Sequence, residues 1–74
     1  MKLAFIGTGK IIADALFAIE SIKEIEKTAI FARPHSKEKA EAFAKQYNIA
    51  EVYTDYEKLL TETAADTVYI GLIN

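Results

Sequence analysis

Short apolar segments alternate with segments of helical periodicity along the whole chain, and this order limits the fold more than any other feature. The apolar segments cover residues 2–7, 28–32, 52–53 and 66–72, and the helical segments cover residues 10–22, 36–47 and a brief stretch after residue 54. Strands that alternate with helices form parallel sheets through right-handed crossovers. The sequence therefore predicts one α/β domain over residues 1–74, a partial Rossmann-like parallel sheet in the order βαβαβαβ with strand order 3-2-1-4.

Polar residues mark the expected helix ends. Ser36 precedes the second helical segment and is expected to cap it, and Asn48 suits a left-handed exit from its end. Thr54 followed by Glu57 has the spacing of a capping box, so Thr54 is expected to cap the third helix. The apolar side chains that this helix is expected to bury are Tyr56, Leu59 and Leu60.

Composition excludes several classes of function. With 51% hydrophobic and 27% charged residues, the chain is typical of a globular domain, and a net charge of −2 gives no general attraction for nucleic acid or an anionic membrane. No cysteine is present, which removes disulfides and thiol nucleophiles, and the single histidine and scattered carboxylates show no metal-ligand spacing. No apolar stretch is long enough for a membrane span or a signal-peptide core, so a cytoplasmic location is expected.

All three glycines follow predicted strands. Gly7 and Gly9 enclose Thr8 between the first strand and the first helix, and Gly71 lies at the end of the last strand. This strand–glycine–helix order lets the backbone approach a pyrophosphate, because Gly7 permits a tight turn and Gly9 has no side chain to keep the phosphate away. A simple turn between strand and helix is the alternative, but the βαβ context favours phosphate binding.

The dinucleotide fingerprint GxGxxG is incomplete, because Ile12 occupies the position of its third glycine and Ala13 follows. That glycine normally permits close packing of the helix on the strand. Ile12 therefore predicts a slightly displaced helix, or a shift of one residue that brings Ala13 to the contact. Lys10 lies at the helix N-terminus, where a cation opposes the helix dipole unless an anion binds nearby. An exposed lysine without a role is the alternative.

The second strand ends in Arg33, where NAD-binding folds usually carry an acidic residue for the ribose hydroxyls. An arginine there can pair with a 2′-phosphate and stack on adenine, and His35, Ser36 and Lys37 can add donors to the same phosphate. Because no carboxylate lies at this position, the sequence favours NADP over NAD as the cofactor. The alternatives are a solvated arginine at a strand end and a surface histidine.

Four segments together resemble the N-terminal domain of the glucose–fructose oxidoreductase/inositol dehydrogenase family (Gfo/Idh/MocA): KLAFIGTGKI, FAR…SKEKAEAFAKQYNI, VYTDYEKLL and DTVYIGLIN. The resemblance runs along essentially the whole chain. It implies a Rossmann domain followed by a larger substrate domain, and hydride transfer between a nicotinamide and a carbon that bears a sugar or cyclitol hydroxyl.

The resemblance also implies which residues meet the cofactor. The dinucleotide loop would comprise Gly7, Thr8, Gly9, Lys10 and Ile11. Arg33 would lie at the adenosine ribose, and Asn74 matches an asparagine that the family places near the cofactor. Gly71 is expected on the other side of the same crevice.

The chain departs from the family pattern in three respects, the first being that the turn Arg33-Pro34-His35-Ser36 is longer than the family's usual link before the second helix. Leu72 and Ile73 replace a Thr-Pro pair, and the Glu-Lys-Pro segment with the family's catalytic lysine does not occur in these 74 residues. We therefore expect a truncated chain that binds the cofactor and catalyses nothing by itself. The alternative is a non-enzymatic module that senses a dinucleotide or mediates association. Because the last predicted strand has an open apolar edge, self-association through it, or marginal stability, is also expected.

Overall fold

The computed structural model describes residues 1–71. Its elements follow the chain in the order β1 (Lys2–Ile6), α1 (Lys10–Ile19), β2 (Glu26–Phe31), the 3-10 helix η1 (Pro34–Ser36), α2 (Lys37–Tyr47), β3 (Glu51–Tyr53), α3 (Tyr56–Glu62) and β4 (Thr67–Ile70). Strands and α-helices alternate as the sequence predicts. The turn after β2 is a 3-10 helix that begins at a proline, whose fixed φ suits a first helical position.

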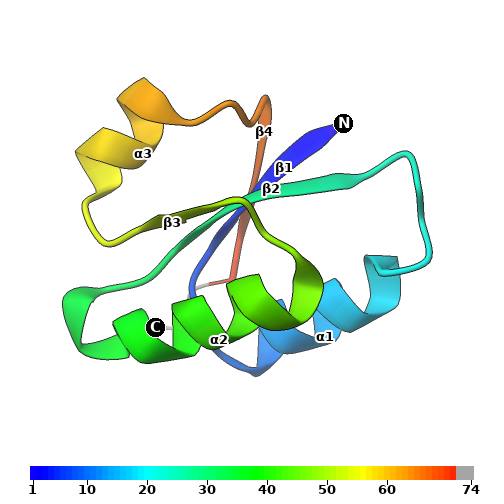
Figure 1. The fold of residues 1–74 in the computed structure, drawn as a ribbon, viewed down its shortest axis with the longest axis horizontal. Helices are drawn as coiled ribbons and strands as arrows, with labels where there is room; N and C mark the ends of the chain where they lie inside the picture. Colours follow the sequence, from blue (N-terminus) through cyan, green and yellow to red (C-terminus); the bar gives the residue numbers. More distant parts are fainter. Residues whose placement is uncertain (72–74) are drawn as a thin grey trace.

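The four strands form one parallel sheet in the order β3-β2-β1-β4, which confirms the predicted order 3-2-1-4. α1 and α2 cover one face of the sheet, and α3 lies on the other (Figure 1). The helices lie on different faces because the chain reverses its direction across the sheet. It moves outward from β1 to β3 and then returns to β4 on the other side of β1. Right-handed crossovers that run in opposite directions place their helices on opposite faces. The strand order therefore reverses between β1 and β4, where such sheets bind ligands beyond the carboxyl ends.

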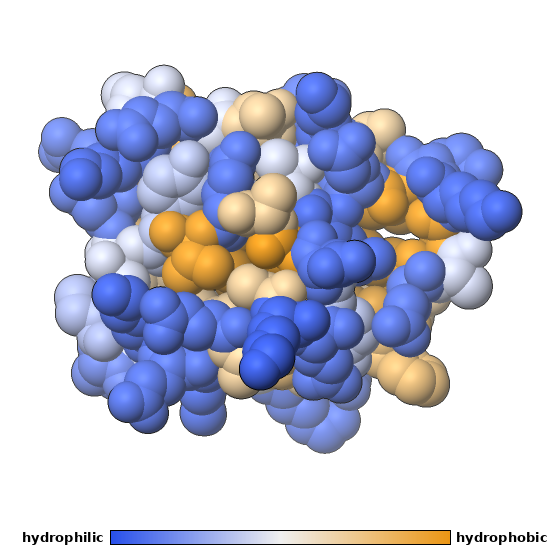
Figure 2. Space-filling model, in the orientation of Figure 1, coloured by the Kyte–Doolittle hydropathy of each residue, from blue (hydrophilic) through white to orange (hydrophobic). Residues whose placement is uncertain are grey.

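β1 is buried on both faces, as its continuous apolar sequence predicts. The larger core lies under α1 and α2, and its bulkiest fully buried side chains are Phe5, Ile12, Leu16 and Ile30. The core on the α3 face is small and consists of Ala4, Ile6, Ala29 and Leu59. Polar residues dominate the outside, with apolar residues visible in the gaps between them (Figure 2). α1 is thus held against the sheet by its own apolar face.

β4 pairs with β1 on one edge, and no other strand among residues 1–71 pairs with its second edge. Val68, Tyr69 and Ile70 are 44%, 39% and 64% exposed. The ring of Tyr69 contacts Phe5 edge-on, with 6.3 Å between the ring centroids. The apolar open edge that the sequence predicts is therefore present in the described part of the chain.

The ends of the first two helices differ in part from the predictions. α1 ends at Ile19 rather than at residue 22, so Ile22 lies in the following turn and remains exposed. Ser36 is the residue before α2, as predicted, but its side chain makes no capping hydrogen bond. Instead its backbone N–H closes the preceding turn by donating to the Arg33 carbonyl at 2.8 Å. Asn48 adopts the predicted left-handed conformation, with φ of 61°.

Two predictions about α3 are wrong. Asp55, not Thr54, caps the helix, and its carboxylate accepts hydrogen bonds from the backbone N–H groups of Glu57 and Lys58 at 2.9 and 3.3 Å. A carboxylate at this position also matches the positive end of the helix dipole. Of the three side chains predicted to be buried, only Leu59 is; Tyr56 and Leu60 are exposed, since this short helix turns one narrow face to the sheet.

Candidate functional site

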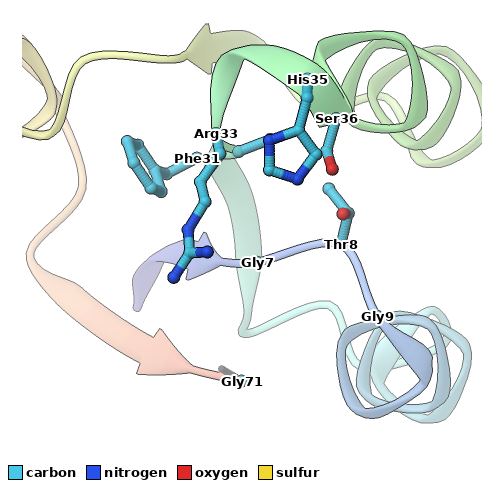
Figure 3. A pocket seen from close by; sticks show the side chains of 9 residues that line it. Gly7, Thr8, Gly9, Phe31, Arg33, His35, Ser36 and Gly71 are labelled. Carbon is cyan, nitrogen blue, oxygen red and sulfur yellow. The ribbon is translucent and has the colours of Figure 1, made fainter. Parts of the chain in front are cut away.

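A hollow of about 270 Å³ opens at the carboxyl ends of β1, β2 and β4, next to the point where the strand order reverses. Its lining comes from the turn after β1, the end of β2 with η1, and the end of β4, and consists of Gly7, Thr8, Gly9, Phe31, Ala32, Arg33, His35, Ser36 and Gly71. Figure 3 shows these segments around the opening. The topology thus brings together seven of the residues that the sequence singled out.

Gly7 forms the turn that leads from β1 into α1. Its φ of 120° lies in the region that side chains disfavour, so the turn requires glycine. Its N–H donates to the carbonyl of Phe31 at 2.9 Å, which ties the end of β1 to the end of β2. The turn is therefore fixed by the sheet before any ligand binds.

Gly9 is the N-cap residue of α1, and its carbonyl accepts the first helical hydrogen bond, from the N–H of Ala13 at 3.0 Å. Its φ of −79° and ψ of −169° are open to any residue. A Cβ atom at Gly9 would meet nothing within 4 Å. No side chain caps the first turn of α1, so the backbone N–H groups of this turn have no partner from a capping side chain. The chain itself gives no steric reason for glycine here.

Gly71 lies where β4 ends, and its N–H donates to the carbonyl of Ile6 at 2.9 Å. A Cβ atom at Gly71 would lie 2.6 Å from Cδ1 and 2.8 Å from Cγ1 of Ile12, far inside van der Waals contact. Ile12 is completely buried. The missing third glycine of the fingerprint is thus matched by a glycine on the facing strand, and Ile12, not Ala13, makes the contact.

The turn after β2 supplies the polar side of the hollow. Arg33 is exposed, and its side chain extends over the opening toward the turn at Gly7 (Figure 3). His35 lies beside it, and the side chains of Ser36 and Thr8 face each other across the opening. One arginine, an imidazole and two hydroxyls therefore line a space whose remaining walls are the three glycines, Phe31 and Ala32.

Four residues that the sequence predicts at the site are not in the lining, and one of them is Lys37, the first residue of α2. The Lys10 ammonium donates to the Asp14 carboxylate at 3.0 Å along the outside of α1. Ile11 is partly exposed, and its Cγ2 would lie 3.5 Å from a Cβ at Gly71. Asn74 lies outside the described residues.

The sequence did not single out Phe31 and Ala32, which also line the hollow. Phe31 is half-buried, and its ring meets Tyr56 edge-on with 5.6 Å between the centroids. Their position at the carboxyl end of an apolar strand could have identified both, because this end of the strand faces the opening.

A second hollow of about 580 Å³ lies beyond β3, between the starts of α2 and α3. Its charged lining mixes both signs and consists of Lys37, Glu41, Asp55 and Lys58. The carboxylate of Asp55 already caps α3. The mixed charges of this hollow therefore favour neither an anionic nor a cationic ligand.

The titratable groups with shifted pKa values lie outside the candidate site. Burial, followed by the hydrogen bond from its hydroxyl to Glu51 at 3.1 Å, raises the pKa of Tyr53. A hydrogen bond from the Thr67 hydroxyl lowers the pKa of Asp66. Within residues 1–71 no cluster of His, Asp and Glu side chains could hold a metal ion. No helix in the same part of the chain has the length and apolarity that crossing a membrane requires.

Comparison with known proteins connects this geometry to a family. The family model described as "Oxidoreductase family, NAD-binding Rossmann fold" (Gfo/Idh/MocA) matches residues 1–74. The chain is 29% identical over 73 residues to the trans-1,2-dihydrobenzene-1,2-diol dehydrogenases of Xenopus tropicalis and Xenopus laevis. The match covers 99% of this chain and 22% of each relative, so the chain spans about a fifth of their length.

Solved structures share the fold. Apo scyllo-inositol dehydrogenase from Lactobacillus casei superposes with a TM-score of 0.82 at 17% identity. The structure of that enzyme with bound cofactor NAD(H) and scyllo-inositol gives the same TM-score at 19% identity. Both matches cover 99% of this chain and 21% of the other. The partial Rossmann architecture is therefore that of a known dehydrogenase domain.

Proposed function

This chain belongs to the Gfo/Idh/MocA oxidoreductase family, and on that premise we propose that its NAD-binding Rossmann domain holds the dinucleotide in the hollow at the carboxyl ends of β1, β2 and β4, with NADP(H) preferred to NAD(H). The pyrophosphate would lie against the turn from Gly7 to Gly9 and the first turn of α1, and the adenosine half against Arg33. The nicotinamide, when bound, supplies or accepts the hydride.

Gly9 carries the proposal. The fold itself explains why the other two described glycines are glycine, since Gly7 has a positive φ and Gly71 makes room for Ile12. Gly9 has an ordinary backbone conformation and empty space where its side chain would be. That space adjoins helix amides without a side-chain cap, which is where a phosphate binds in dinucleotide-binding folds. The absence of a side chain at Gly9 is therefore explained by a ligand rather than by the fold.

The preference for NADP(H) rests on the end of β2. Residues 31–37 contain Arg33, His35 and Lys37 and no Asp or Glu. A carboxylate there would hydrogen-bond the ribose hydroxyls of NAD and repel a 2′-phosphate, whereas a guanidinium attracts the phosphate and can donate two hydrogen bonds to it. The Arg33 side chain already extends over the opening (Figure 3).

We propose that the protein carrying this domain transfers a hydride between the nicotinamide and the hydroxyl or carbonyl carbon of a sugar- or cyclitol-like substrate. The names of its relatives support this class, since one oxidises a cyclic diol and another an inositol. The described residues offer contacts for the cofactor and no paired acid and base beside it. The 74-residue chain is therefore proposed to bind the cofactor without catalysing the reaction.

Titration calorimetry with NADPH and NADH tests the proposal. We expect both to bind and NADPH to bind about tenfold or more tightly, because a charge-assisted hydrogen bond to a phosphate contributes on the order of 1.5–3 kcal/mol. Absence of binding by either dinucleotide would overturn the cofactor assignment. Tighter binding of NADH would overturn only the preference.

Self-association of the 74-residue chain is a further part of the proposal, supported by the exposed edge of β4. An unpaired strand edge with apolar side chains is a template for a second strand, and a second copy supplies the same edge in the antiparallel direction. This observation also favours the association module that was the alternative function. The cytoplasmic location stays a prediction from the sequence.

A further inference from the structure

We propose that Ile12 and Gly71 form a size-matched pair that replaces the third glycine of the fingerprint and sets the position of the first turn of α1 over the hollow. Both are positioning residues, and the inference rests on the proposed function. Ile12 is the large residue, on the helix. Gly71 is the small one, at the end of the strand, and its lack of a side chain leaves room for Ile12.

The direction of the missing Cβ supports this assignment. Gly71 lines the hollow, so its lack of a side chain could serve either a ligand or the fold. The three heavy atoms nearest to a Cβ at Gly71 all belong to Ile12 and Ile11 of α1, at 2.6, 2.8 and 3.5 Å. The position of a side chain on Gly71 is thus already occupied by α1. Gly71 is required by the helix rather than by the ligand.

The surroundings leave the pair little freedom. The backbone N–H of Gly71 donates to the carbonyl of Ile6 in β1, one of the two inner strands of the sheet. Ile12 is completely buried in the core under α1, with Phe5 and Leu16 in the same cluster. A larger residue at position 71 is therefore expected to push against Ile12 and the turn of α1 that carries it, because the Ile12 side chain is completely buried and packed in the core.

Ile12 is the third residue of α1, in the turn that follows the N-cap residue Gly9 at the hollow, and the uncapped amides of this turn are the groups proposed to bind the pyrophosphate. Displacing Ile12 moves these amides together with the N-cap residue Gly9, because they belong to one rigid helical turn. Phosphate binding at a helix N-terminus depends on the distance and direction of such amides. A side chain at Gly71 is thus expected to weaken pyrophosphate binding without touching the pyrophosphate.

Two ligands separate this positioning role from general damage to the fold. NADPH contains the pyrophosphate, whereas adenosine 2′-monophosphate has the adenine and the 2′-phosphate but no pyrophosphate. For Gly71→Ala we expect a loss of about tenfold or more in NADPH affinity, with the affinity for adenosine 2′-monophosphate within about twofold of wild type. Unchanged NADPH binding, or an equal loss for both ligands, would overturn the inference.

A second substitution that restores NADPH affinity identifies the residue that Gly71 accommodates. Ile12→Ala removes both atoms that crowd a Cβ at Gly71, so the double variant Ile12→Ala/Gly71→Ala is expected to regain NADPH affinity to within about threefold of Ile12→Ala alone. Leu16→Ala/Gly71→Ala is the matched control, because Leu16 is equally buried in α1 and is not among the atoms that crowd Gly71. Rescue by both double variants, or by neither, would contradict the proposed pair.

The measurements distinguish a Gly71→Ala variant that does not fold from a proposed function that is wrong. If Gly71→Ala does not fold, the double variant with Ile12→Ala must restore a folded chain that binds NADPH, and a double variant that stays unfolded overturns the inference. If the wild-type chain binds neither NADPH nor NADH, the proposed function fails, and the positioning role fails with it. If the wild type binds NADPH and the rescue is absent, only the pair is refuted.

Discussion

The ammonium group of Lys10 lies 3.0 Å from the carboxylate of Asp14, one turn further along α1. Both side chains are highly exposed, and the pair runs along the helix surface instead of toward the hollow. The acidic partner offsets the unfavourable position of a cation at a helix N-terminus. Lys10 therefore has a structural partner that does not depend on a phosphate.

Replacement of Lys10 by methionine is expected to have little effect on cofactor binding. NADPH affinity should change by less than about twofold, and the free energy of unfolding by less than about 0.5 kcal/mol, because an exposed pair of this kind contributes little. Calorimetry and urea denaturation measure the two quantities. A tenfold loss of affinity would instead show that Lys10 leaves Asp14 to reach the phosphate.

Gly9→Ser separates stability from binding. Serine is a favourable N-cap residue and φ at Gly9 is −79°, so the free energy of unfolding should stay within about 0.5 kcal/mol of wild type or rise. The new side chain occupies the empty space beside the helix amides, so NADPH affinity should fall about tenfold or more. Serine that leaves NADPH affinity unchanged would show that no phosphate approaches Gly9.

Arg33→Ala tests cofactor preference. NADPH affinity should fall by about tenfold to a hundredfold, since the variant loses charge-assisted hydrogen bonds to the 2′-phosphate. NADH affinity should change by no more than about threefold, because NADH has no 2′-phosphate. Lys45→Ala, which removes the same charge from the last turn of α2, is the matched control. Equal losses for both dinucleotides after Arg33→Ala would refute a role in discrimination.

Asp66 gives the sheet a dependence on pH. Its carboxylate accepts hydrogen bonds from the Thr67 hydroxyl at 2.9 Å and from the Lys2 backbone N–H at 3.2 Å. The first of these is the largest cause that lowers the pKa of Asp66 in the folded chain. A lowered pKa means that the ionised carboxylate stabilises the fold above its unfolded pKa, and that this contribution disappears as the pH falls through its folded pKa.

Urea denaturation of the wild type and of Asp66→Asn measures this contribution. The wild type should be the more stable chain at about pH 7, and the difference should shrink as the pH falls through the lowered pKa of Asp66, where the carboxylate becomes protonated. Asp14→Asn, an exposed carboxylate on α1, controls for the general loss of one negative charge. A difference that does not change with pH would argue against the ionised form of Asp66 as the stabilising species.

The open edge of β4 predicts concentration-dependent association. Val68→Lys places a charge on this edge, so the dissociation constant of the self-associated form should rise by about tenfold or more. Phe17→Lys is the matched control, since Phe17 is 74% exposed on α1, outside the sheet. Sedimentation velocity over a range of concentrations measures both. A wild type that stays monomeric at high concentration refutes the proposed association.

Local periodicity was sufficient to predict the architecture. The apolar run of β1 and the glycines after it are contiguous in sequence, and crossovers then leave few possible strand orders. Helix ends were less predictable. Thr54 and Asp55 are adjacent candidates for a cap, and only the backbone at the start of α3 decides between them. After Ile19 the sequence carries no glycine or proline that would signal the end of α1.

The sequence predicts those residues of the hollow that follow strands. It does not predict those whose place depends on packing between distant segments. Gly7, Gly9 and Arg33 lie at strand ends, which a parallel sheet gathers at one edge. The contact between Ile12 and Gly71 joins a helix near the start of the chain to a strand near residue 70, so no local pattern reveals it. Through this contact α1 can pack closely although the third glycine of the fingerprint is missing, because the glycine lies on the strand instead of on the helix.

The pairing of β1 with β4 also constrains the order in which the molecule can assemble. The hydrogen bond between Lys2 and Asp66 closes a separation of 64 residues, whereas β1 meets β2 through the much shorter α1 crossover. Closing the longer loop costs more chain entropy, so β1, α1 and β2 are expected to form a nucleus and β4 to dock last. One wall of the proposed cofactor hollow, the end of β4, is therefore expected to form last and to open first in native-state hydrogen exchange.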